Sequence, residues 1–220
     1  MAITFKEKIK TLIKLTSEPK VLNALISLRH SGYFIDKGWF NAFKLNKPVD
    51  KMLKPIPWVT YPFIDFLEGR FNKNINLLEF GSGYSTLYFS EMVSKVTAVE
   101  HNLEWYKKLI DLVPENVILI NTNPDSVKTY FDCMKNLKET FDFILIDGIF
   151  RNECCYEAIN LHSDIGVVVL DDSERIEYRE GINYILSKGF KKIDFWGISP
   201  GYLYTKATSI FYKMNNCLNI

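Results

Sequence analysis

The stretch from residue 77 to residue 86 constrains this chain most, because an apolar run ends there in two closely spaced glycines. Residues 77–80 predict a short buried strand, and residues 86–91 predict the start of a helix. Between them, Gly81 and Gly83 allow the backbone to turn sharply and to approach a ligand, because glycine has no Cβ. A strand, a glycine turn and the outward-pointing amides of a helix N-terminus together predict a nucleotide or dinucleotide pocket.

Two acidic residues accompany the turn. Glu79 precedes it on the strand, and Glu100 ends the next apolar run, residues 96–100. Thr86 stands where a dinucleotide fingerprint has a third glycine or alanine. A carboxylate at the end of a second parallel strand can accept hydrogen bonds from both ribose hydroxyls, and Glu79 could meet an ammonium group through the glycine gap. A ligand with an amino-acid end, a nucleoside end and no phosphate fits this pattern better than NAD does.

Residues 79–83, Glu-Phe-Gly-Ser-Gly, together with Glu100 resemble the class I S-adenosylmethionine (SAM)-dependent methyltransferases. The resemblance spans residues 58 to 213 and implies an EC 2.1.1 activity with SAM as cofactor. It implies a Rossmann-like α/β fold, a doubly wound and mostly parallel seven-stranded sheet with its last strand antiparallel. The SAM-binding residues that it implies are Glu79, Gly81, Ser82, Gly83, Ser85, Thr86, Glu100, His101, Asn123 and Asp147.

After the glycine turn, strand and helix patterns alternate. The expected strands are residues 96–100, 116–120, 141–147 and 166–171, and the expected helices are residues 103–110, 125–137, 151–161 and 174–187. Continuous apolar strands between helices predict a parallel sheet covered on both faces, with the loops that follow the strands on one edge. The linker between the last two expected strands, 192–196 and 208–212, is too short for a crossover helix, so this pair should be antiparallel.

Acidic residues end two of these strands on the same edge. Asp147 follows the fourth strand, and Asp171 and Asp172 end the fifth. Converging carboxylates need a cation, a basic side chain or water, and a hard ion such as Mg²⁺ takes oxygen ligands. The pattern is similar to the metal-dependent catechol-type O-methyltransferases, which implies Mg²⁺ or another divalent cation at all three residues, although Asp172 replaces an asparagine of that family. Alternatively, Arg151 could neutralise Asp147 or Asp171, and Asp172 or Ser173 could cap the next helix.

Asp147 and Arg151 are the expected catalytic side chains. If the acceptor is a hydroxyl, its proton must be lost to a carboxylate or through a metal, and Asp147 is the preferred acceptor. Trp58 and Tyr61, within the proline-rich stretch 54–62, would either line the mouth of the active site or pack a bend. For Trp105, stacking near an adenine and packing in the core stay open. His101 could lie near the ribose or be only a loop residue, and Asn123 could contact the adenine or belong to a turn.

The N-terminal residues 1–57 predict a helical extension before a methyltransferase domain of residues 58–220. Helices are expected from residue 3 to about residue 45. The extension could pack on the domain, act as a substrate lid, form a homodimer contact or lie on a membrane surface as a basic helix. The residues that could share one apolar face are Ile3, Ile9, Leu12 and Ile13.

Composition and short motifs bear on the partners, the metal sites and the cellular location of the protein. The 220-residue chain is 47% hydrophobic with a formal net charge of +1, so its charge does not favour nucleic acid. DNA is not an expected partner, because residues 147–150 lack the Asn/Asp-Pro-Pro-aromatic run of base methyltransferases. The four cysteines indicate neither a disulfide framework nor a zinc site. The N-terminus is charged and lacks the apolar core of a signal peptide. No apolar run is long enough to span a bilayer. We therefore expect a cytoplasmic protein.

The predicted function is therefore SAM-dependent methyl transfer, to an oxygen of a small molecule or a saccharide. The alternatives are methylation of protein or RNA on the same fold, and a non-catalytic SAM-binding or interaction module.

Overall fold

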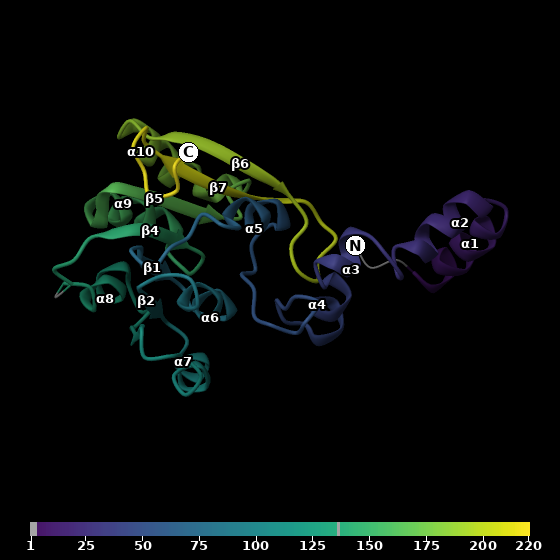
Figure 1. Cartoon of the computed structure of the whole chain (residues 1–220), viewed down its shortest axis with the longest axis horizontal. Coiled ribbons are helices and arrows are strands. Elements are labelled where there is room, and N and C mark those ends of the chain that lie inside the picture. The colour runs from purple at the N-terminus through teal and green to yellow at the C-terminus, as the bar shows by residue number, and fades with distance from the viewer. Residues whose placement is uncertain (1–3, 136) are drawn as a thin grey trace.

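The computed structural model describes residues 4–135 and 137–220, and its centre is a seven-stranded sheet in the order β3-β2-β1-β4-β5-β7-β6 (Figure 1). Strands β1 to β5 are parallel, while β7 runs antiparallel to both β5 and β6. This confirms the predicted doubly wound sheet with a reversed last strand. The strands are β1 (Asn76–Phe80), β2 (Lys95–Glu100), β3 (Val117–Asn121), β4 (Phe141–Ile146), β5 (His162–Asp171), β6 (Lys191–Gly197) and β7 (Lys206–Tyr212).

Helices follow the strands as the alternation predicts. Those of the sheet region are α5 (Tyr61–Leu67), α6 (Tyr84–Ser90), α7 (Leu103–Leu109), α8 (Val127–Asp132), α9 (Arg151–Leu161) and α10 (Arg179–Ser187). The helix expected over 174–187 begins instead with a 3-10 turn, η1 (Ile176–Tyr178), and the one expected over 125–137 is shorter. Ile3 and Asn136, which fall in expected helices, lie outside the described residues.

Strand β5 starts four residues earlier than the pattern predicts, and the reason lies at Gly166. The pairing of β4 with β5 shifts register between Phe141 and Phe143. A Cβ on Gly166 would lie 2.9 Å from the carbonyl oxygen of Phe141. The glycine therefore lets the strand continue through a close approach of two backbones, where the sequence alone suggests a break.

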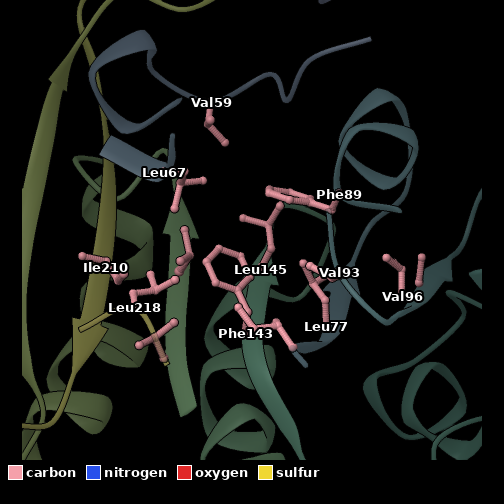
Figure 2. Close-up of a cluster of buried hydrophobic side chains, with 14 of the residues drawn as sticks. Val59, Leu67, Leu77, Phe89, Val93, Val96, Phe143, Leu145, Ile210 and Leu218 are labelled. Atoms are coloured by element: carbon pink, nitrogen blue, oxygen red, sulfur yellow. The ribbon is translucent and has the colours of Figure 1, made fainter. Parts of the chain in front are cut away.

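Two apolar clusters fill the two faces of the sheet, and alternate strand residues contribute to each. Leu77 and Leu145 belong to the first cluster, which α5 and α6 cover and which Figure 2 shows. Leu78 and Ile146 belong to the second, beneath α8, α9 and α10. Burial on both faces is why these strands read as continuous apolar runs.

The N-terminal helices divide into two parts. The helices α1 (Phe5–Thr16) and α2 (Pro19–Ser27) stand away from the sheet (Figure 1), and neither has a buried residue. The helices α3 (Tyr33–Asp36) and α4 (Trp39–Leu45) lie closer, and Trp39 is buried against the body. Within the described ranges, no helix combines the length and the apolar character required to cross a membrane.

Candidate active site

The glycine turn lies between the ends of β1, β2 and β4. Gly81 has a φ of +101°, a conformation that favours glycine, and its N–H donates to the carbonyl of Val99 at 2.9 Å. A Cβ on Gly81 would come within 3.1 Å of the nitrogen of Gly148. Gly83 differs, because its φ of 168° is ordinary extended backbone and a Cβ there would find its nearest neighbour, the ring of Trp105, 3.9 Å away. Gly81 therefore serves the turn, whereas Gly83 leaves space beside it.

Glu100 is held against this turn. Its Oε2 accepts two hydrogen bonds from Ser82, one from the backbone N–H at 3.2 Å and one from the side-chain hydroxyl at 2.7 Å. Its Oε1 accepts the N–H of Asn102 at 2.7 Å and lies 3.4 Å from Nδ1 of His101. A carboxylate has about four lone-pair sites, so about one remains for a ligand. The structure thus brings the Glu100 carboxylate, at the end of β2, against the glycine turn, as predicted.

Glu79 points into the start of α6. It is 1% exposed, its Oε1 accepts the hydroxyl of Ser85, and its Oε2 accepts that of Thr86 at 2.5 Å. The Thr86 hydroxyl oxygen also accepts the N–H of Gly83 at 2.9 Å. Burial raises the pKa of Glu79 to about 8, although the two hydroxyls act in the opposite direction. Glu79 and Thr86 therefore support the turn from beneath, and the contact of Glu79 with an ammonium group stays a prediction.

A cavity of about 440 Å³, called the first cavity below, opens beside the turn. This volume lies within the roughly 300–1,000 Å³ of small-molecule sites. Trp105 forms one wall, and its indole N–H donates to the carbonyl of Ser82 at 2.9 Å. The first cavity is lined by Asn46, Lys47, Pro48, Trp58, Ser82, Gly83, Tyr84, Ser85, Trp105 and Asp147.

The carboxylates at the ends of β4 and β5 face cationic side chains. Arg151 donates from Nη2 to Oδ1 of Asp147 at 2.9 Å and from Nη1 to the carbonyl of Asp171 at 2.6 Å. The ammonium of Lys206 bonds to Asp171 and lies 2.8 Å from Oδ1 of Asp172. Arg175 pairs with Asp172 at 2.7 Å. The sequence-based alternative, in which Arg151 neutralises Asp147, is thus present in the structure.

Burial and these ion pairs together shift the pKa values of the groups in the cluster. Burial raises the pKa of Asp147, against the opposing effects of Arg151 and Lys206. Burial acts to raise the pKa of Asp172 as well, but Lys206, Arg151 and Arg175 outweigh it and lower that pKa. Burial acts to lower the pKa of Lys206, whereas Asp171, Asp147 and Asp172 outweigh it and raise that pKa. The neighbouring carboxylates therefore stabilise the charged form of Lys206.

The predicted metal site at Asp147, Asp171 and Asp172 gains no support from this geometry. The Lys206 ammonium forms ion pairs with Asp171 and Asp172, and the Arg151 guanidinium forms one with Asp147. In the described part of the chain, no group of three or more His, Cys, Asp or Glu side chains is arranged to hold a metal ion. The donor set present is that of a salt-bridge network.

A second cavity of about 300 Å³ adjoins this network, and Trp58 and Asp147 line both cavities. Trp58 stacks on Tyr202 with ring centroids 5.4 Å apart, and its indole N–H donates to the carbonyl of Pro200 at 2.7 Å. The second cavity is lined by Trp58, Asp147, Asp171, Asp172, Tyr202, Tyr204 and Lys206. The prediction that Trp58 lines a mouth of the site therefore agrees with its position.

Other predicted residues lie elsewhere. Tyr61 is 1% exposed and packs with Trp39, so it does not line the mouth. The Asn123 side chain accepts the N–H of Asp125 at 2.9 Å, which is the turn interpretation. Of the predicted SAM-binding residues, Ser82, Gly83, Ser85 and Asp147 line the first cavity. Those that line neither cavity are Glu79, Gly81, Thr86, Glu100, His101 and Asn123. Arg151 is 10% exposed and bonds to the protein itself, so it positions strand ends rather than facing a ligand.

Two parts of the site were missed by the sequence reasoning. One is residues 46–48, which form a wall of the first cavity because the chain after α4 returns to the turn. The other is Lys206, the first residue of β7. An antiparallel strand beside β5 places its beginning next to the end of β5, so a lysine at the start of the last strand could have been recognised as the counter-ion of Asp171.

Comparison with protein-family models and with curated proteins gave no match. Several solved structures are similar to this chain. The O-methyltransferase from Bacillus cereus in complex with SAH has a TM-score of 0.52 and 20% identity, covering 69% of this chain and 78% of that chain. Precorrin-6y C5,15-methyltransferase from Geobacter metallireducens has a TM-score of 0.51 and 14% identity, covering 69% and 88%.

A third similar structure is the O-methyltransferase TomG from Streptomyces achromogenes, involved in tomaymycin synthesis and solved in complex with SAM. Its TM-score is 0.50 and its identity 14%, covering 69% of this chain and 78% of that chain. These likenesses agree with the strand order and with the antiparallel β7. The chain has the fold of the class I SAM-dependent methyltransferases.

Proposed function

We propose that this chain binds SAM in the first cavity and transfers its methyl group to an oxygen of a small molecule or a saccharide. The observation that carries the proposal is the cavity beside Gly83, with the carboxylate of Glu100 anchored to the same turn. The fold adds support, because two of the similar O-methyltransferases were solved with SAH or SAM.

The residues present fit the cofactor. The bare backbone of Gly83 leaves space that a side chain would fill, and the remaining lone pair of Glu100 suits a ribose hydroxyl. Trp105 offers an aromatic wall for the adenine. When bound, SAM supplies an electrophilic methyl group on a sulfonium. The protein's own task is then to position an acceptor oxygen in line with that carbon and to take up its proton.

Asp147 is our candidate for the proton acceptor, because it lies at the junction of the two cavities. Arg151 holds its Oδ1 at 2.9 Å, which leaves Oδ2 for the proton that the acceptor hydroxyl loses. The raised pKa of Asp147 improves it as a base near neutral pH.

The second cavity is our candidate acceptor site. It combines the stacked rings of Trp58 and Tyr202 with the charged groups of Asp172 and Lys206. Flat aromatic faces pack against a sugar or aromatic ring, and the polar groups can hydrogen-bond its hydroxyls. This composition favours a small hydroxylated acceptor.

Calorimetry of the full chain with SAM tests cofactor binding, and Gly83→Val is the sharpest variant. The backbone at residue 83 is extended, and the new side chain has room within the protein, so the variant should fold. It should bind SAM more weakly than wild type, and Gly83→Ala should have an intermediate affinity for SAM. Gly81→Val is less informative, because a side chain at φ +101° strains the turn. Unchanged affinity in folded Gly83→Val, or no heat with wild type, would remove the assignment.

Acceptor identity is tested separately, by transfer of a labelled methyl group from SAM to panels of phenols, hydroxylated small molecules and saccharides. Label in a product oxygen supports the proposal. Label only in added RNA or protein would contradict the small-molecule assignment while leaving SAM binding intact. Parallel assays with magnesium and with a chelator should give equal rates, because Lys206 and Arg151 occupy the acidic cluster.

A further inference from the structure

The hairpin of α1 and α2 presents an apolar face that nothing in the described chain covers. Eight of its large apolar side chains, between Phe5 and Leu28, are 39–78% exposed. Leu15 and Leu22 are only half-buried, so the packing of the two helices leaves the rest in solvent. Exposed apolar side chains gathered on one element point to an interaction site, whereas single ones need no explanation. The exposed apolar side chains are Phe5, Ile9, Leu12, Ile13, Val21, Leu25, Ile26 and Leu28.

The same hairpin is strongly basic. Between residues 4 and 30 there are two acidic side chains, Glu7 and Glu18, against six basic ones. The whole chain has a net charge of only +1, so positive charge is concentrated here and the remainder is slightly acidic. The basic side chains are Lys6, Lys8, Lys10, Lys14, Lys20 and Arg29.

Helical geometry separates the two properties on α1. At 100° per residue, Ile9, Leu12 and Ile13 share one side of α1. Lys6, Lys8 and Lys10 flank that side, and Lys14 lies opposite. A helix with this arrangement lies in the plane of a lipid interface, with its apolar face among the acyl chains and its lysines among anionic headgroups. The lysine stems are long enough to reach those headgroups from the edges of the apolar face.

Contacts behind the hairpin hold the following segment against the body. Arg29 lies over the ring of Phe40 at 4.6 Å, and Lys37 pairs with Asp65 of α5. The hairpin thus projects from an anchored base, as Figure 1 shows. This leaves its exposed residues accessible to a large flat surface.

We propose that the α1–α2 hairpin docks the protein onto a lipid surface rich in anionic headgroups. A second copy of the chain is the weaker occupant, because two such hairpins would bring like charges together. An anionic bilayer instead complements both the charge and the apolar face.

Co-sedimentation of the full chain with vesicles tests this. Wild type should bind vesicles of phosphatidylcholine with phosphatidylglycerol, bind pure phosphatidylcholine far less, and release at high salt. Lys6→Glu/Lys10→Glu should lower the partition coefficient at least about 25-fold, since each lost cation costs about fivefold. Leu12→Ser/Ile13→Ser should abolish binding.

The matched control, Lys188→Glu/Lys191→Glu, reverses the charge of two exposed lysines outside the hairpin and should bind vesicles almost like wild type.

Four outcomes would overturn the proposal. They are no binding to anionic vesicles, equal binding to both vesicle types, equal loss in the control and hairpin variants, and a lipid-free dimer that Leu12→Ser/Ile13→Ser converts to monomer. Sedimentation velocity measures the last. Because these residues are exposed, the variants should retain the wild-type thermal transition, which confirms that they are folded.

Discussion

At the scale of single residues, folding changes the pKa of Glu79. The folded protein raises its pKa from the ordinary 4.5 to about 8 through burial. The native state therefore binds this proton more tightly than the unfolded chain does. The stability that the proton contributes is complete below about pH 4.5 and is lost as pH rises through about 8.

Glu79→Gln should remove this dependence, because glutamine keeps partners for Ser85 and Thr86 but cannot ionise. We expect the unfolding free energy of wild type, relative to Glu79→Gln, to fall by on the order of a few kcal/mol as pH rises toward 8. Urea denaturation of both proteins across that pH range measures the difference. If the unfolding free energies of the two proteins differ by the same amount at every pH, Glu79 does not titrate between about pH 4.5 and pH 8.

Asp147 gives the second test at this scale. Asp147→Asn should leave SAM affinity close to wild type and slow methyl transfer by about 10²–10⁴-fold, the usual contribution of a general base. Single-turnover transfer with an identified acceptor measures the rate, and calorimetry measures the affinity. Asp111→Asn, an exposed aspartate on the surface, is the matched control. Turnover of Asp147→Asn within twofold of the control would exclude Asp147 as the base.

At the scale of elements, Arg151 connects the ends of neighbouring strands. It donates to the carbonyl of Gly148 at 3.0 Å, beyond β4, and to that of Asp171 at 2.6 Å, the last residue of β5. Its side chain is only 10% exposed. This position at the first turn of α9 makes it a clamp on the edge of the sheet.

Arg151→Met should therefore lower the unfolding free energy by about 3 kcal/mol, because the partly buried Asp147 carboxylate and two carbonyls lose their donor. Arg151→Lys should recover only part, since an ammonium lacks the forked geometry. Lys135→Met, which breaks the exposed pair with Asp132, is the control and should change little. Chemical denaturation measures all three. A stable Arg151→Met with normal structure would argue for a role beyond the clamp.

The elements also show what could be predicted from sequence and why the rest could not. The glycine turn and Glu100 are local signals, so their meeting followed from the order of strands. A reversed strand beside β5 would have indicated Lys206 as the counter-ion of Asp171, but spacing along the chain does not tell which strand β7 pairs with. Tyr61 turns into the core although it lies three residues from Trp58, which lines both cavities. Side-chain direction at a proline-rich bend depends on packing against distant residues such as Trp39.

At the scale of the whole molecule, the sheet and the hairpin differ in what stabilises them. Strand β4 is buried on both faces, with Phe143, Ile144 and Leu145 all at 0% exposure. Helices α1 and α2 have 12 and 9 residues and no buried residue. Helices of fewer than about 12–15 residues are marginal in water unless tertiary packing holds them. The hairpin should therefore open far more often than the sheet.

Amide hydrogen exchange, followed by mass spectrometry, measures this difference directly. In buffer, the amides of α1 and α2 should exchange orders of magnitude faster than those of β4. Anionic vesicles should slow exchange in the hairpin and leave β4 unchanged, because lipid would cover the apolar face that the protein leaves open. The Leu12→Ser/Ile13→Ser variant should lose only the lipid effect. Slow exchange of the hairpin without lipid would mean that another surface already covers it, and a second copy would then become the better explanation.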